Sequence, residues 1–218
     1  MRLAYRVWGD PAAPPLLLLH GLGSDGSTWE GTAPAFADMW RVYAPDLRGH
    51  GRSSRPGAYS CELMRDDVLG FMDALGLGRA SCVGHSLGAL VAYLVARHSP
   101  ARVGRLVLEE MPPPVPLGLP EPKRPEESVP FDWDVRPAIV GQLNAPDADW
   151  WEGIPKIGTP TLVVAGGHQS HLPQDRIAEM AARFPKGHLL TIPVGHQVHG
   201  VLPLDFGEVA RSFLAASR

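Results

Sequence analysis

The chain has 218 residues, 44% of them apolar and 20% charged, which are ordinary values for a globular protein with one sizeable core. Its formal net charge of −3 gives no electrostatic reason to expect nucleic acid or an anionic membrane surface as a partner. These values favour a small-molecule partner and a single domain of residues 1–218, and they leave the oligomeric state open.

Apolar runs alternate with amphipathic segments along most of the chain. The expected strands are residues 3–8, 15–19, 41–44, 80–83, 103–109, 161–165 and 188–192. The expected helices are residues 27–39, 61–75, 87–97, 174–184 and 205–216. Ser27 is the expected cap of the first helix, with Glu30 completing a capping box. This alternation predicts an α/β fold with a mostly parallel sheet of about seven strands, flanked by helices and joined by right-handed crossovers.

The alternation is interrupted between residues 111 and 158. Proline dominates residues 111–130, and it excludes regular elements there because it fixes φ and lacks a backbone donor. Short helices are expected at residues 135–143 and 148–152. We interpret residues 111–158 as a short Pro-rich lid inserted into the domain.

Residues 84–88, Gly-His-Ser-Leu-Gly, lie between an apolar run and a helical segment and fit the pattern G-x-S-x-G. This pattern is typical of the nucleophile elbow, in which a sharp turn raises a serine, here Ser86, above the sheet. Glycines at positions 84 and 88 allow the close backbone approach that such a turn requires. In a chain with 24 glycines the pattern could also be an ordinary turn, so the surrounding motifs decide its meaning.

Three motifs together resemble those of the α/β-hydrolase fold superfamily: His-Gly-Leu-Gly at residues 20–23, the residues 84–88, and the pair Gly195–His196. Residues 46–53, Asp-Leu-Arg-Gly-His-Gly-Arg-Ser, are a further stretch similar to the family, so the resemblance covers almost the whole chain. It implies a thinly covered pocket at the carboxyl ends of the strands. The fold hosts many chemistries, so the resemblance does not imply one reaction.

A serine nucleophile needs a base to take its proton, and the resemblance implies His196, which follows the last expected strand. His199 is the alternative base. His20 and His85 are expected to support turns, and the residues expected on the surface or in loops are His98, His168, His171 and His188. The histidine spacing matches no metal motif, so we expect no metal and no cofactor.

The acid departs from the family pattern, because Gln169 stands where the usual aspartate should follow strand 161–165. An amide can orient an imidazole but cannot stabilise the imidazolium by charge. Some members of the superfamily carry the acid at the end of the preceding strand, where this chain has Glu109 and Glu110. Since neighbouring strand residues face opposite sides, only one of them can easily point at His196. We predict Glu110, the outermost of the two, with Glu109 as the alternative.

The rest of the site follows from the same reasoning. Backbone N–H groups of Leu22 and Leu87 are predicted to form the oxyanion hole. The side chains predicted to bind substrate are Trp133, Trp150 and Met111, and packing in the core or lid is the alternative role of each.

The sequence therefore predicts a serine hydrolase with the catalytic triad Ser86, His196 and Glu110, which cleaves an ester, lactone or thioester of a small apolar molecule. Two alternatives stay open. One is a C–C bond hydrolase, lyase or cyclase that uses the same residues. The other, motivated by Gln169, is a non-catalytic ligand-binding protein.

Two cysteines are too few for a disulfide framework, and Cys82 lies in an apolar run that indicates a buried strand. The first six residues lack the apolar core of a signal peptide, and the apolar run at residues 15–19 is too short to span a bilayer. We therefore expect reduced cysteines and a cytoplasmic location.

Overall fold

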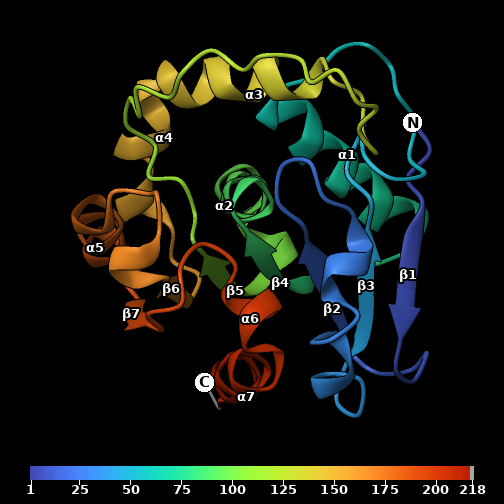
Figure 1. Ribbon diagram of the computed structural model, residues 1–218. Coiled ribbons are helices and arrows are strands. Elements are labelled where there is room, and N and C mark those ends of the chain that lie inside the picture. The colour runs from blue at the N-terminus through green and yellow to red at the C-terminus, as the bar shows by residue number, and fades with distance from the viewer. Residues whose placement is uncertain (217–218) are drawn as a thin grey trace.

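Seven strands form one sheet at the centre of the computed structural model, which describes residues 1–216 (Figure 1). The strands are β1 Tyr5–Trp8, β2 Pro15–Leu19, β3 Arg41–Pro45, β4 Ala80–His85, β5 Val103–Glu109, β6 Thr161–Ala165 and β7 Gly187–Thr191. Their spatial order is β1-β3-β2-β4-β5-β6-β7, and only β1 pairs antiparallel with its neighbour. The predicted α/β class with a mostly parallel sheet is confirmed.

Both faces of the sheet are covered, which explains why β2 is apolar at every position. In β2, Leu17 and Leu19 belong to the apolar core on one face, and Leu16 and Leu18 belong to the core on the other. Each strand residue points to the opposite face from the one before it, so the run of four leucines serves two cores at once.

The helices divide between these faces and the segment above the sheet (Figure 1). They are α1 Cys61–Ala74, α2 Leu87–His98, α3 Val135–Asn144, α4 Ala148–Glu152, α5 Gln174–Arg183, α6 Val198–Val201 and α7 Pro203–Ala215. The first core contains residues of α1, α2 and α5, and the second contains residues of α7. Among residues 1–216, none of the helices combines the length and the apolar character needed to cross a bilayer.

The helix predicted for residues 27–39 is wrong. Two short 3-10 helices, Gly26–Trp29 and Ala33–Ala35, occupy this segment instead. The cap of the first is Asp25, whose carboxylate accepts a hydrogen bond from the Ser27 amide at 2.7 Å, and Glu30 binds Arg6 rather than closing a capping box. Pro34 lacks an amide donor, so a continuous helix cannot pass through it without losing a hydrogen bond.

The predicted lid, residues 111–158, is called here the lid segment. Its first part contains no helix, and α3 and α4 follow. The extended part is attached to the end of α3, because the Leu119 amide donates to Asn144 Oδ1 at 2.7 Å and Asn144 Nδ2 donates to the Leu119 carbonyl at 2.8 Å. In Figure 1, α3 lies across the top of the molecule above α1 and α2.

Candidate active site

The turn between β4 and α2 has the geometry of a nucleophile elbow. Ser86 has φ 52° and ψ −117°, a backbone conformation that residues other than glycine rarely adopt. A Cβ atom at position 84 would lie 2.5 Å from the Ala89 amide nitrogen, and one at position 88 would lie 2.2 Å from the Leu19 carbonyl oxygen. Both glycines are therefore required by close approach of neighbouring backbone, as the sequence predicted.

His196 and Glu110 lie together beyond the carboxyl ends of β7 and β5. His196 Nδ1 is 3.1 Å from Glu110 Oε2, within hydrogen-bonding distance, and the Glu110 side chain is fully buried. This contact leaves Nε2 as the free ring nitrogen of His196. Between the described residues, His196 and the Ser86 hydroxyl make no hydrogen bond, but both line the same cavity. Catalytic hydrogen bonds are often long in structures without substrate.

Three further donors surround the Glu110 carboxylate. The Gly166 amide donates to Oε1 at 2.5 Å, the Gln174 side-chain amide donates to the same oxygen at 3.1 Å, and the Ser170 hydroxyl donates to Oε2. Burial alone would raise the pKa of Glu110, but the hydrogen bonds from His196, Ser170, Gly166 and Gln174 outweigh it and hold the pKa below its ordinary range. Glu110 is therefore ionised at neutral pH.

Glu109, the alternative acid, binds a different histidine. Its Oε2 is 2.7 Å from His199 Nδ1, and its Oε1 accepts the His199 backbone amide at 2.9 Å. Both side chains are buried, and the His199 ring stacks on Trp29 at 4.1 Å between centroids. His199 does not line the cavity that contains Ser86. The structure thus places Glu110 with His196 and Glu109 with His199.

Gln169 lies on the protein surface and takes no part in either pair. His85, predicted to support a turn, has its Nε2 2.8 Å from the His196 carbonyl, so the ring donates there and fixes the His196 backbone. Burial lowers the pKa of His85 to about 4 and keeps it neutral. His20 has a similar supporting position, since its Nε2 accepts the Leu47 amide at 2.9 Å.

Leu22 and Leu87, the predicted oxyanion donors, both line the cavity beside Ser86. Leu87 is the first residue of α2, so its amide has no acceptor within the helix. Within residues 1–216, neither the Leu22 nor the Leu87 amide donates a hydrogen bond to another residue. Two unused amides next to a serine can stabilise negative charge that develops on a substrate oxygen.

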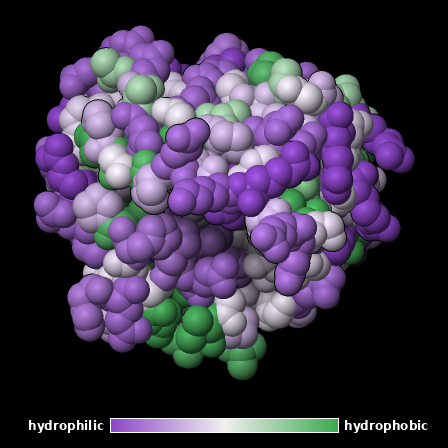
Figure 2. All heavy atoms as spheres, turned by 45° about the horizontal axis from the view of Figure 1, so that its top comes forward, coloured by the Kyte–Doolittle hydropathy of each residue, from purple (hydrophilic) through white to green (hydrophobic). Residues whose placement is uncertain are grey.

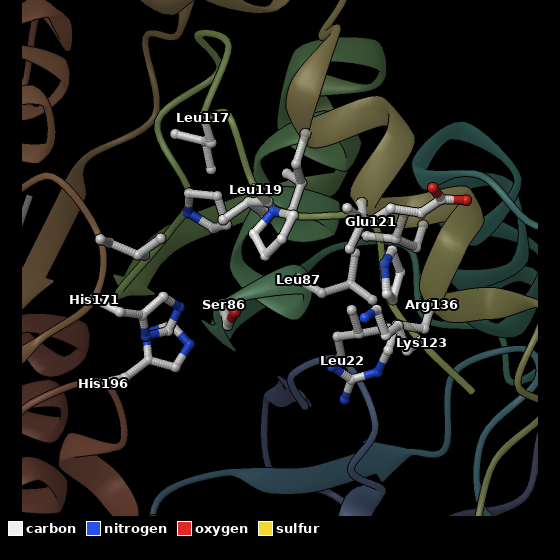
Figure 3. A pocket seen from close by; sticks show the side chains of 17 residues that line it. Leu22, Ser86, Leu87, Leu117, Leu119, Glu121, Lys123, Arg136, His171 and His196 are labelled. Atoms are coloured by element: carbon white, nitrogen blue, oxygen red, sulfur yellow. The ribbon is translucent and has the colours of Figure 1, made fainter. Parts of the chain in front are cut away.

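The cavity has a volume of about 500 Å³, within the usual range for small-molecule sites. Most of its lining is apolar and includes Leu22, Leu87, Leu117, Leu119, Ile139 and Leu143. In Figure 3, Ser86 lies between His171 and His196 on one side and Leu22, Arg136 and Lys123 on the other. The lid segment supplies the wall facing Ser86.

The residues predicted to bind substrate lie elsewhere. Met111 and Trp150 are buried in the core, and the Trp150 carbonyl accepts the Tyr93 hydroxyl at 2.5 Å. Trp133 packs near Phe131 and the Arg136 guanidinium. None of the three lines the cavity, so the sequence was wrong about the lining. Their large apolar side chains are used to fix the lid segment to the core instead.

Sequence reasoning missed four residues of this site. Ser170 and Gln174 hold Glu110, the His171 ring lies 4.3 Å from the His196 ring, and Arg136 lines the cavity. His171 was predicted as an ordinary surface or loop residue. For the first three, the available signal was the position of residues 170–174 shortly after the end of β6, at the same sheet edge as Ser86 and His196.

Cys61 and Cys82 are both buried and unpaired with one another. Burial raises the pKa of the Cys82 thiol to about 12, so it is not a nucleophile at neutral pH. Within the described residues, no group of three or more His, Cys, Asp or Glu side chains is arranged to hold a metal ion.

The model of the alpha/beta hydrolase fold family matches residues 14–138, which is more than half of the chain. The chain belongs to this family. Its structure is similar to that of a hydrolase from Pseudomonas aeruginosa, with 29% identity, a TM-score of 0.82, and coverage of 98% of this chain and 94% of that one.

Two curated relatives differ in how much of their length aligns with this chain. The sn-1-specific diacylglycerol lipase of Mus musculus is 27% identical over 95% of this chain and 83% of its own length. The putative carbamate hydrolase RutD of Caulobacter segnis is 40% identical, over 49% of this chain and 42% of its own length. The chain spans only 31% to 42% of the length of the relatives that match it at 40% identity.

Proposed function

We propose that this protein is a serine hydrolase that cleaves an ester, lactone or thioester of a small, mostly apolar molecule through an acyl-enzyme. The observation that carries the proposal is the contact of 3.1 Å between His196 Nδ1 and a buried, ionised Glu110, at the edge of a cavity that Ser86 also lines. A charged acid orients the imidazole and stabilises the imidazolium that forms when the serine loses its proton. The loss of the usual aspartate at position 169 therefore does not remove the acid.

The proposed reaction has two halves. Ser86 Oγ attacks the carbonyl carbon while His196 Nε2 takes the hydroxyl proton, and the oxyanion is held by the amides of Leu22 and Leu87. His196 then gives the proton to the leaving group, and the acyl group stays on Ser86. In the second half, His196 deprotonates a water that attacks the acyl carbon, and the proton returns to Ser86 as the acid product leaves.

The relatives support acyl chemistry at this coarse level. One is named a diacylglycerol lipase and another a putative carbamate hydrolase, and the substrates in both names contain a carbonyl carbon bound to a heteroatom. The apolar lining of a cavity of about 500 Å³ supports a small substrate with an apolar acyl or alcohol part. We also retain the expectation of a cytoplasmic location with reduced cysteines.

The test is covalent labelling with a fluorophosphonate probe, together with hydrolysis of p-nitrophenyl butyrate. Wild-type protein should gain one probe per chain on Ser86 and release p-nitrophenol, whereas Ser86→Ala should do neither. Ser212→Ala, at an exposed position of α7, is the matched control and should behave as wild type.

Folded wild-type protein that neither reacts with the probe nor hydrolyses the ester would refute the proposal and favour a ligand-binding role. Labelling of Ser86 without turnover of simple esters would instead favour the C–C bond hydrolase, lyase or cyclase, because those reactions use the same nucleophile and base on another substrate.

A further inference from the structure

Arg136 is a cationic side chain built into a cavity that is otherwise mostly apolar. It is the second residue of α3, in the lid segment, and it is half-buried. Its Nη2 atom lies next to Gly23: a Cβ atom added to Gly23 would be only 3.2 Å from Nη2. Gly23 follows Leu22, the predicted oxyanion donor. The guanidinium therefore lies beside the loop that faces the reacting carbonyl.

Aromatic rings hold the guanidinium in this place. Arg136 Cζ is 5.7 Å from the centre of the Phe131 ring and 5.9 Å from the centre of the Trp133 ring. Such contacts with ring faces stabilise a cation and limit its rotamers. These contacts use no N–H donor of the guanidinium in a hydrogen bond, so the donors remain available to another ligand.

Arg136 has no anionic partner among residues 1–216: it forms neither an ion pair nor a side-chain hydrogen bond with any of them. The two acidic residues nearest in sequence are Asp132, which accepts the Tyr59 hydroxyl at 2.5 Å, and the exposed Asp134. Glu121 lines the same cavity without pairing with Arg136, and Lys123 adds a second positive charge to the lining.

We propose that Arg136 binds a carboxylate of the substrate, so that the substrate is an ester or lactone with a free carboxylate away from the bond that is cleaved. This inference rests on the proposed serine hydrolase. In Figure 3 the cation and the imidazole of His196 lie on opposite sides of Ser86, so a chain that reaches both passes over the nucleophile. Leu22 and Leu87 give that chain an apolar surface.

A planar carboxylate matches the paired N–H groups of a guanidinium, and a phosphate can be bound by the same groups. The face turned forward in Figure 2 is hollowed near its middle and mostly hydrophilic around the hollow, as the entrance of a polar ligand requires. We commit to the carboxylate, and the test below includes the phosphate.

The experiment compares p-nitrophenyl half-esters of dicarboxylic acids of four to eight carbons with the methyl esters of the same compounds. The methyl esters have nearly the same length and no charge. The readout is the ratio of kcat/KM for the acid to kcat/KM for its methyl ester. Wild type should prefer the acid at one chain length, and Arg136→Gln should lower the ratio by about 10- to 100-fold, the usual worth of a charged hydrogen bond. Arg136→Lys should retain part of the preference.

Arg124→Gln, exposed and outside the cavity lining, is the matched control and should leave the ratio unchanged. A ratio unchanged in Arg136→Gln, or lowered instead by Lys123→Gln, overturns the assignment to Arg136 while hydrolysis of the methyl esters still supports the serine hydrolase. If the wild-type protein cleaves neither ester, the proposed hydrolase function is refuted, and the role of Arg136 needs a separate test. Calorimetric binding of glutarate to Ser86→Ala, and its loss in Ser86→Ala with Arg136→Gln, then tests the cation alone.

Binding of p-nitrophenyl phosphate or inorganic phosphate more tightly than glutarate, with the same dependence on Arg136, would overturn the carboxylate and assign a phosphate to this position.

Discussion

Glu109 and Glu110 are neighbours in the chain, yet their carboxylates bind two different histidines, His199 and His196. Both imidazoles pack against His85, with centroid distances of 4.9 Å and 4.8 Å. Glu109 is the last residue of β5, whereas Glu110 has φ 47°, so the chain turns sharply between them. This turn sends one carboxylate into the protein core and the other toward the cavity.

The first prediction concerns the acid. Glu110→Gln should lower kcat/KM for p-nitrophenyl butyrate by about 10²- to 10⁴-fold, because an amide cannot stabilise the imidazolium of His196 by charge. Gln169→Ala is the matched control, since Gln169 is exposed and makes no hydrogen bond to His196, and its kcat/KM should stay within about threefold of wild type. A large loss in Gln169→Ala together with a small one in Glu110→Gln would contradict the assignment. Circular dichroism of both variants excludes unfolding as the cause.

The second prediction concerns the strain at Ser86, whose φ of 52° and ψ of −117° suit glycine better than any other residue. Ser86→Gly and Ser86→Ala both remove the proposed nucleophile, but only glycine relieves the strain of the backbone at this position. Ser86→Gly should therefore have the larger free energy of unfolding in urea, by about 1 kcal/mol. Equal or lower stability of the glycine variant would mean that the elbow stores no strain.

The third prediction concerns acid stability. Burial lowers the pKa of His20 to about 4, of His50 to about 3 and of His85 to about 4, compared with an ordinary value of 6.5. Between these values the unfolded chain binds protons that the folded chain does not, so stability is complete above pH 6.5 and falls as the pH decreases through the folded pKa values. Each histidine should contribute a loss of about 1.4 kcal/mol per pH unit in this window.

Urea unfolding at several values between pH 7.5 and pH 5 measures this loss. His50→Gln should weaken the dependence on pH by about a quarter to a third, because glutamine does not titrate and burial lowers the pKa of His171 as well as those of His20 and His85. His188→Gln, at an exposed position of β7, is the control. Stability that is constant from pH 7.5 to pH 5 would show that the buried rings take up protons without unfolding.

The sequence alone was sufficient to predict the structure of those segments in which one local cause determines it. The leucines of β2 and the glycines around Ser86 have few alternatives, because full burial and close backbone approach each exclude most other residues. The pattern was ambiguous where two caps compete: Asp25, not Ser27, caps the segment after β2. Nothing local distinguishes a carboxylate from a hydroxyl in that role.

The surroundings of the acid could not be predicted, because they come from distant parts of the chain. Ser170 and Gln174 lie 60 and 64 positions from Glu110, and only the pairing of β5 with β6 brings them together. Arg136 was missed for the same reason, since its place in the cavity depends on how the lid segment packs beside the loop after β2. We predicted that Trp133 and Trp150 of the lid segment bind substrate, but in the structure both pack in or against the core.

The fourth prediction separates the two kinds of glycine in this chain. A Cβ atom at Gly88 would be 2.2 Å from the Leu19 carbonyl oxygen and 2.6 Å from that of His20, and neither backbone atom can move without shifting β2. Gly88→Ala should lower the free energy of unfolding by about 3 kcal/mol or more. Gly70, on the exposed side of α1, has nothing within 4 Å of such an atom, so Gly70→Ala should raise it by about 0.5 to 1 kcal/mol through helix propensity. Urea unfolding of both variants measures the difference, and a Gly88→Ala protein as stable as wild type would mean that α2 does not approach β2 as closely as described.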